Sequence, residues 1–478
     1  MPAPQRDDGD TTGGLGKVRT NFLLIHADQH RYDCMGVSGH PLVHTPNLDR
    51  LAAEGMFFSH AFCPVPVCAP SRASLLFGTW PSRHESITNA GIEVSAPVRD
   101  DLPAFTQVLS EHGYHVAGVG KWGIISRRTP QELGFDVFIA DAEYRAWRKA
   151  QGIPDRPSTN GWFGEVDPYI TPEKSRLAWG ADRIIELLRE RARERAPFFL
   201  RWDPPEPHLP NVVPEPYATM YDPADIEPWP SFAETFVGKP YIQRQQLESW
   251  GIADWTWDDW RPVVSRYLGE ITLLDAQVGR ILDALDELGL AEETMVVYTT
   301  DHGDMCGGHR MIDKHYVMYD DVVRVPLIVR WPGRIKPGSR SDAFVATGLD
   351  LARTFLEAAE LPVPQEFQGE SLLPVFRGES NGRESVYAVY HGGQFGLYSQ
   401  RMVRTREWKY VWNPTAEDEL YHLATDPAEL HNRAADRACA DVLKALRRLV
   451  VEWMEATGDR LLNHWTRRQL LEGKKMAR

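Results

Sequence analysis

The chain has 478 residues, of which 42% are hydrophobic and 25% are charged, and its formal net charge is −14. This is the composition of an ordinary globular protein. The negative charge argues against non-specific binding to nucleic acid and, more weakly, against an anionic membrane surface. No apolar run approaches the roughly 20 residues that a membrane-spanning helix needs. From the charge we expect no nucleic-acid partner, and from the charge and the short apolar runs together we expect no membrane partner.

The first 18 residues have the character of a disordered tail. The segment Arg6-Asp7-Asp8-Gly9-Asp10 lacks the basic region and the apolar core of a signal peptide. The cysteines are odd in number and have no metal-ligand spacing, which favours neither a disulfide framework nor a zinc site. They lie at positions 34, 63, 68, 306 and 439. Together these features predict a cytoplasmic protein.

Short apolar runs alternate with segments of helical period through most of the chain. This alternation predicts an α/β fold, with a large, mostly parallel sheet sandwiched by helices, over residues 19–379. The expected strands are residues 22–25, 115–119, 198–200, 295–298 and 325–329. The expected helices are residues 47–54, 102–111, 175–193 and 264–288.

The pattern changes near residue 380. Four short apolar runs, separated by turn residues, favour a small antiparallel sheet, and the segment 442–457 has the period of a helix. The expected strands are residues 386–390, 402–405, 409–412 and 420–423. We therefore expect a smaller C-terminal α+β subdomain over residues 380–478.

Polar residues follow the predicted strands of the large sheet. Asp28-Gln29 ends the first strand, Lys121 follows the second and Asp301-His302 ends the fourth, while a proline-rich loop leads from the third to His208. Ligands of open parallel sheets bind outside the carboxyl ends of the strands. These side chains are therefore expected to meet in one site.

The string Cys68-Ala69-Pro70-Ser71-Arg72 precedes an apolar run. Such a string arises by chance in roughly one chain of this length in a thousand. Pro70 suits the first turn of a helix, which would leave Cys68 just ahead of the helix N-terminus, where the backbone favours an anion. Arg72 adds a planar, permanently charged fork that suits a tetrahedral oxyanion.

This string resembles the C-x-P-S-R motif of the formylglycine-dependent (type I) sulfatases of the alkaline phosphatase superfamily. Gly120-Lys121-Trp122 is similar to a second motif of that family. Residues 300–304, followed by His309 and Lys314, are similar to a third. The resemblance covers most of residues 20–435 and implies an alkaline-phosphatase-like fold and the hydrolysis of a sulfate ester.

The resemblance also implies the chemistry of the site. Cys68 would be oxidised to formylglycine by a formylglycine-generating maturation enzyme, and the hydrated aldehyde would attack sulfur. One divalent metal would be held by Asp28, Gln29, residue 68, Asp301 and His302. The sulfate oxygens and the leaving group would be held by Arg72, Lys121, His208 and Lys314. Carboxylate and amide oxygens favour Ca²⁺, with Mn²⁺ or Mg²⁺ as alternatives because an imidazole takes part.

The chain departs from the family pattern at two positions. Gln29 stands where the family often has a second Asp, and Gly123 stands where it often has a His. The pocket is therefore expected to differ from that of the usual aryl and sugar sulfatases. A small sulfated sugar, aryl sulfate or alkyl sulfate remains the expected substrate, and assembly into a homo-oligomer stays open.

Two alternative functions also stay open. One is a phosphonate monoester or phosphodiester hydrolase of the same superfamily, which the Asp28-Gln29 pair resembles. The other belongs to a different class: a non-catalytic anion-binding protein in which Cys68 remains an unmodified thiol.

Overall fold

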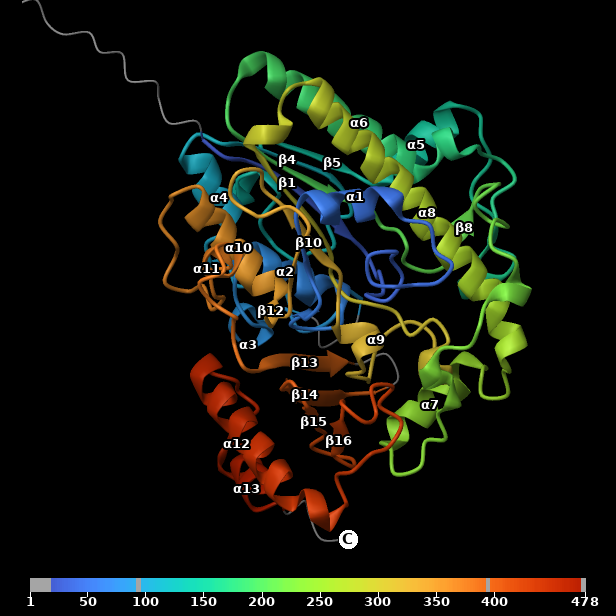
Figure 1. Ribbon diagram of the computed structural model, residues 1–478, viewed down its shortest axis with the longest axis vertical. Helices are drawn as coiled ribbons and strands as arrows, with labels where there is room; N and C mark the ends of the chain where they lie inside the picture. The colour runs from blue at the N-terminus through green and yellow to red at the C-terminus, as the bar shows by residue number, and fades with distance from the viewer. Residues whose placement is uncertain (1–18, 92–95, 393–395, 474–478) are drawn as a thin grey trace, which may run out of the picture.

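The computed structural model describes residues 19–91, 96–392 and 396–473, so the expected tail at residues 1–18 lies outside the described residues. The chain forms an eight-stranded sheet, ordered β11-β2-β10-β9-β1-β7-β4-β5, with a four-stranded sheet beside it (Figure 1). The strands of the large sheet are β1 (Asn21–Ala27), β2 (Met56–Phe58), β4 (His115–Gly120), β5 (Val137–Ala140), β7 (Phe198–Asp203), β9 (Thr294–Thr300), β10 (Leu327–Arg330) and β11 (Ser339–Ser341).

Five neighbouring strands, β9, β1, β7, β4 and β5, run parallel, and β10 is antiparallel to both β9 and β2. All seven residues of β1 are buried, because helices cover the sheet on both faces. This burial explains why β1 reads as a continuous apolar run rather than as an alternating pattern. The expected mostly parallel sheet is confirmed.

Helices form a layer on each face of the large sheet (Figure 1). On one side, α8 packs against α1 and α6. On the other side, α10 packs against α2 and α4. These helices are α1 (Pro46–Glu54), α2 (Cys68–Phe77), α4 (Phe105–Glu111), α6 (Arg176–Glu194), α8 (Trp257–Glu287) and α10 (Thr347–Ala358).

Two helix starts differ from the sequence prediction. Helix α8 begins at Trp257, because the Asp259 carboxylate accepts hydrogen bonds from the backbone N–H and the hydroxyl of Thr256 and caps the first turn. The helix then continues through Pro262. Helix α2 begins at Cys68 itself, after Val67 in an extended conformation. Cys68 is therefore the first helical residue, where its backbone N–H is still one of the unsatisfied donors of the helix start.

The small sheet lies beside the large one and has the order β13-β14-β15-β16, with every pair antiparallel. Its strands are β13 (Val386–Gly392), β14 (Tyr398–Arg404), β15 (Trp408–Trp412) and β16 (Glu419–His422). Helices α12 (Ala440–Thr457) and α13 (His464–Glu472) follow, and α12 packs on β14 and β15 (Figure 1). The domain boundary near residue 380 stays a prediction. Among the described helices, none is both long and apolar enough to cross a bilayer.

Candidate active site

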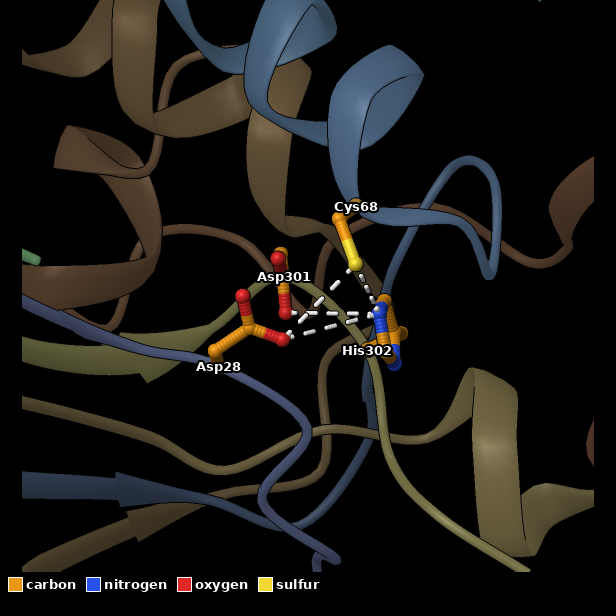
Figure 2. A group of neighbouring side chains, drawn as sticks. All are labelled: Asp28, Cys68, Asp301 and His302. Atoms are coloured by element: carbon orange, nitrogen blue, oxygen red, sulfur yellow. Dashed lines mark hydrogen bonds and ion pairs between the residues drawn. The ribbon is translucent and has the colours of Figure 1, made fainter. Parts of the chain in front are cut away.

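Four buried side chains meet where β1 and β9 end and where α2 begins (Figure 2). They are Asp28, Cys68, Asp301 and His302, and one potential ligand atom from each lies within 4.8 Å of the others. The Nε2 atom of His302 lies 3.2 Å from Cys68 Sγ, 3.6 Å from Asp301 Oδ1 and 3.9 Å from Asp28 Oδ1. The ends of β1 and β9 therefore meet as predicted, and the start of α2 adds Cys68 to them.

The donor set fits one divalent cation. Metal–ligand bonds are about 2.0 to 2.6 Å long, so four atoms at these separations can reach the same ion. His302 donates its Nδ1 hydrogen to the carbonyl oxygen of Gly303 at 2.8 Å, so Nε2 is the ring nitrogen that faces the cluster. A backbone partner of this kind orients a metal-binding histidine.

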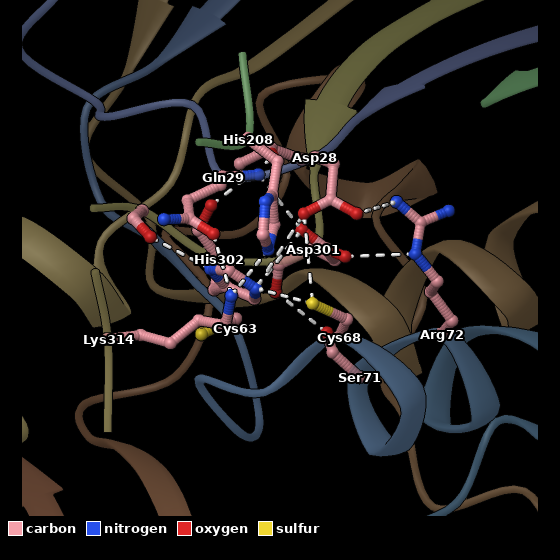
Figure 3. Close-up of polar contacts among 12 residues, drawn as sticks. Asp28, Gln29, Cys63, Cys68, Ser71, Arg72, His208, Asp301, His302 and Lys314 are labelled. Atoms are coloured by element: carbon pink, nitrogen blue, oxygen red, sulfur yellow. Dashed lines mark hydrogen bonds and ion pairs between the residues drawn. The ribbon is translucent and has the colours of Figure 1, made fainter. Parts of the chain in front are cut away.

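Arg72 holds the two carboxylates of the cluster in a defined orientation (Figure 3). Its side chain is completely buried; Nη2 donates to Asp28 Oδ2 at 3.1 Å and Nε donates to Asp301 Oδ2 at 2.9 Å. Both Oδ2 atoms are thus occupied by the guanidinium, and both Oδ1 atoms face His302. The guanidinium positions the carboxylates, while its predicted contact with sulfate oxygens stays a prediction.

Lys121 follows β4 and reaches the same cluster. Its ammonium group contacts Asp28 Oδ2, and its side chain is a quarter exposed, whereas Asp28 is fully buried. Lys121 is therefore a cation that lies beside the cluster and is open to solvent. This is the placement that recognition of an anionic group by Lys121 requires.

Lys314 and His208 contact each other beside the cluster (Figure 3). The Lys314 ammonium donates to His208 Nε2 at 2.8 Å and to Gln29 Oε1 at 2.7 Å. His208 Nδ1 donates to the carbonyl oxygen of Leu209 at 2.5 Å. Burial lowers the pKa of Lys314, but Asp313 and the other nearby anions outweigh this effect and leave the pKa above its ordinary value.

Gln29 lies beside the four-residue cluster, and its amide is engaged by other groups. Its Nε2 donates to Asp304 Oδ2 at 2.6 Å and to Asp313 Oδ1 at 3.0 Å, and its Oε1 accepts from Lys314. Its backbone N–H donates to Asp301 Oδ1 at 3.2 Å. These contacts make Gln29 a link between the cluster and Lys314, and its role as a metal ligand stays a prediction.

The charge of the cluster also affects Cys68. Burial raises the pKa of the thiol, and the Asp28 carboxylate raises it further. The positive charges on Lys121 and Lys314, with that on His302, outweigh both effects and hold the Cys68 pKa well below its ordinary value. A sulfur at this position is therefore ionised readily, and a thiolate is the reactive form of cysteine.

The structure gives a physical reason for Gly123. Its φ of +61° lies in the left-handed region, and a Cβ built there would lie 2.8 Å from Arg72 Cδ. A histidine at this position would therefore displace the guanidinium that orients Asp28 and Asp301. The departure from the family pattern at Gly123 is linked to the packing of Arg72.

Three acidic residues around the site were missed by the sequence reasoning. Asp304 and Asp313 hold the Gln29 amide, and Asp203 accepts a hydrogen bond from Arg72 at 2.8 Å. Asp203 is the last residue of β7, so the strand-end pattern that singled out Asp28 and Asp301 could have found it. Asp313 precedes Lys314 directly, but that adjacency does not predict the contact with Gln29.

Two family models and several known proteins match most of the chain. The family model described as Sulfatase matches residues 20–361, and the model described as N-sulphoglucosamine sulphohydrolase, C-terminal, matches residues 307–456. An arylsulfatase of Clostridium perfringens is 28% identical over 92% of this chain and 95% of its own. An N-acetylglucosamine-6-O-sulfatase of Bacteroides thetaiotaomicron is 27% identical over 91% of this chain and 86% of its own.

A solved structure is similar over nearly the whole chain. The phosphonate monoester hydrolase of Agrobacterium radiobacter superposes with a TM-score of 0.81 and 26% identity, over 92% of this chain and 96% of that one. The fold is that of the alkaline phosphatase superfamily. Within it, the chain belongs to the sulfatase family. It is a sulfuric ester hydrolase, which argues against the alternative of a non-catalytic anion-binding protein.

Proposed function

We propose that this hydrolase cleaves sulfate monoesters through a formylglycine made from Cys68 and one divalent cation held at Asp28, Asp301, His302 and residue 68. The observation that carries the proposal is the buried group of two carboxylates, an imidazole and a thiol within 4.8 Å of one another. A maturation enzyme that oxidises Cys68 is part of the proposal. When both are present, the cation offsets negative charge on the sulfate, and the hydrated aldehyde offers a nucleophilic oxygen at neutral pH.

Ca²⁺ is the cation that we propose. Two buried carboxylate oxygens form the charged part of the donor set, and hard oxygen ligands favour Ca²⁺ or Mg²⁺. The imidazole of His302 keeps Mn²⁺ as an alternative. Metal analysis of the purified protein, followed by removal and replacement with each ion, distinguishes the three.

The residues of the chain have separate tasks in this proposal. Lys121, beside Asp28 and open to solvent, would bind a sulfate oxygen. Lys314 and His208, in hydrogen-bond contact, would bind the ester oxygen and supply the proton that the departing alcohol needs. Because Nδ1 of His208 is held by a backbone carbonyl, Nε2 is the atom through which the proton would pass.

We propose a sulfated sugar as the substrate class to test first. The support is the similarity over most of the chain to the N-acetylglucosamine-6-O-sulfatase. Aryl and alkyl sulfates are the other candidates, and the similarity to an arylsulfatase supports the first of them.

A phosphonate monoester or phosphodiester hydrolase is the second candidate function. It is favoured by the similarity to the phosphonate monoester hydrolase and by Gln29, whose neutral amide contacts Lys314 where the family often has a carboxylate. Sulfate monoesters, phosphonate monoesters and phosphodiesters each carry one negative charge, so a site that accommodates the charge of one of them accommodates the charge of all three.

The deciding experiment uses matched esters of one phenol, a sulfate and a phenylphosphonate, together with a panel of sulfated sugars. The assay is run on protein in which the conversion of Cys68 has been measured by mass spectrometry. We expect a larger kcat/KM for the sulfate. A larger value for the phosphonate would replace the first function by the second, and no turnover of any ester by fully converted, metal-loaded protein would contradict both.

A further inference from the structure

A buried carboxylate lies directly behind Arg72. Asp203, the last residue of β7, has no exposed surface. Its Oδ1 accepts hydrogen bonds from Arg72 Nη1 at 2.8 Å and from Arg201 Nη2 at 2.7 Å, and Arg201 Nε lies 2.5 Å from its Oδ2. The ring of His26 lies 3.0 Å from the same Oδ1 through Nδ1. Asp203 thus joins three basic side chains from two adjacent strands and one helix.

The contact with Arg72 matters because of what Arg72 holds. The Nε and Nη2 atoms of Arg72 are bound to the Oδ2 atoms of Asp301 and Asp28, and only Nη1 points to Asp203. If the guanidinium turned within its own plane, its contacts with the carboxylates of Asp28 and Asp301 would both change. The bond from Nη1 to Asp203, with a longer one from Nη1 to the Lys121 carbonyl oxygen at 3.2 Å, prevents that rotation, because a planar guanidinium held at three nitrogens has one orientation.

The charges lead to the same conclusion. Arg72 and Arg201 are both buried, and both are bound to Asp203. Burial raises the pKa of Asp203, but Arg201, His26 and Arg72 outweigh it and hold the pKa at about 2, so the carboxylate stays ionised. Without that negative charge, two buried guanidinium groups would face each other and Arg72 would be pushed away from Arg201.

Asp203 also fixes a second cation of the site through its backbone. Its carbonyl oxygen accepts a hydrogen bond from the backbone N–H of Lys121 at 2.8 Å, where β4 ends beside β7. The side chain of Lys121 then contacts Asp28. One residue is therefore the common anchor of Arg72 and of Lys121, the two cations that contact Asp28.

We propose that Asp203 is a positioning residue of the active site: by holding the guanidinium of Arg72, it directs the Oδ1 atoms of Asp28 and Asp301 toward one cation. The effect on cation binding rests on the cation site of the proposed function, whereas the effect on turnover rests also on its ester hydrolysis. Residues that orient metal ligands contribute roughly 10- to 100-fold to metal affinity or activity.

The test is the substitution Asp203→Asn, which keeps the shape of the side chain and removes its charge. Binding of Ca²⁺ and of Mn²⁺ to the metal-free protein is measured by titration calorimetry, and kcat and KM are measured on the best sulfate ester. We expect the dissociation constant of each ion to rise about tenfold or more and kcat to fall by a similar factor. KM, at saturating metal, should change less than threefold, because Asp203 does not reach the substrate.

The matched control is Asp459→Asn. Asp459 is also a buried partner of a buried arginine, with Arg401 Nε at 2.5 Å and Nη2 at 3.0 Å, but it lies in the C-terminal part of the chain. Its substitution carries the same cost of an unpaired guanidinium without touching Arg72. We expect metal affinity and kcat to stay within twofold of the wild-type values in this variant.

A second variant covers the case in which Asp203→Asn does not fold. The double substitution Arg201→Met and Asp203→Asn removes both charges of the buried pair, which is often tolerated, and still removes the negative charge that holds Arg72. Wild-type metal affinity in either folded Asp203 variant would overturn the proposal. If the wild-type protein hydrolyses no ester, the proposed function fails, but the titrations still decide the role of Asp203.

Discussion

The Nζ atom of Lys314 lies 2.8 Å from Nε2 of His208, although the two residues are 106 positions apart in the chain. Lys314 comes from the segment after β9 and His208 from the proline-rich loop after β7. Because His208 Nδ1 is held by the Leu209 carbonyl, the ammonium is the only proton donor within this pair that faces the cluster. A leaving alcohol would therefore take its proton directly from the lysine, or from His208 Nε2 after the lysine has transferred a proton to that nitrogen.

This pair predicts a dependence on the leaving group. Lys314→Met and His208→Gln should each lower kcat about 100-fold or more for an alkyl or sugar sulfate, whose alkoxide needs a proton. The loss should be much smaller for a nitrophenyl sulfate, whose phenolate leaves without one. The measurement is kcat on a series of sulfate esters with leaving groups of graded pKa. Equal losses across the series would show that the pair binds the substrate without protonating the leaving group.

Cys68 provides the second prediction. Cys68→Ala should abolish turnover, because neither a formylglycine nor a thiol can then form, while the melting temperature changes little for the loss of one small side chain. Tryptic mass spectrometry of the wild-type peptide around residue 68 should show a lighter species, since oxygen replaces sulfur and two hydrogens are lost. Activity across preparations should rise in proportion to that species; turnover by protein that lacks it would refute the nucleophile assignment.

Gly123 provides the third prediction. In Gly123→Ala the new methyl group would lie 2.8 Å from Arg72 Cδ, so the guanidinium must shift and kcat should fall about tenfold or more. The matched control is Gly152→Ala, because Gly152 has a similar φ of +70° with no atom within 4 Å of a Cβ. Both variants carry the same backbone cost, so only the first should lose activity and metal affinity. Similar activities of the two variants would contradict a role for the contact with Arg72.

Glu270 provides the fourth prediction, which concerns pH. Burial, reinforced by the neighbouring Glu206 carboxylate, raises the pKa of Glu270 to about 8. The carboxyl group of Glu270 accepts a hydrogen bond from the side-chain amide of Asn211 at 2.6 Å. The same amide also donates to the carbonyl oxygen of Pro207. Between pH 4.5 and 8 the folded protein therefore holds a proton at Glu270 that the unfolded chain has released. Since the folded state binds more protons, the free energy of unfolding must fall as the pH rises through this range.

The variant Glu270→Gln should remove this dependence. Its amide oxygen can still accept from Asn211, and it carries no charge at any pH. Relative to the wild type, its melting temperature should be similar at pH 5 and about 2 °C or more higher at pH 8. Glu165→Gln is the control, because that carboxylate is partly exposed and its pKa is lowered rather than raised. A difference between variant and wild type that stays constant from pH 5 to 8 would contradict the raised pKa.

The sequence predicted a mostly parallel sheet whose strand ends meet at one place, and the structure shows both features. The strand ends at Asp28, Lys121 and Asp301 were visible because buried parallel strands read as apolar runs that stop at a polar residue. The convergence of these ends follows from the geometry of a parallel sheet and needs no atomic detail. The start of α2 was displaced by one residue, because helix ends depend on local backbone geometry that the motif alone does not specify.

Atom-level contacts could not be predicted in the same way. Nothing in the sequence around Arg72 indicates that its three nitrogens bind Asp28, Asp203 and Asp301, since these residues lie at the ends of three different strands. Likewise, the amide of Gln29 could equally have faced a metal, and only the packing of the 301–315 segment turns it toward Lys314. Side-chain direction depends on which neighbours fill the remaining space, and those neighbours come from distant parts of the chain.

The amino-acid sequence by itself therefore determined the family, the α/β architecture and the set of residues at the strand ends, because these depend on local apolar periodicity and on a short motif. Only the tertiary structure decided which oxygen of each carboxylate faces the cluster, which groups hold Arg72 and which imidazole contacts Lys314. Hydrogen bonds a few ångströms long depend on the relative placement of whole strands and helices, and that placement is a property of the packed molecule.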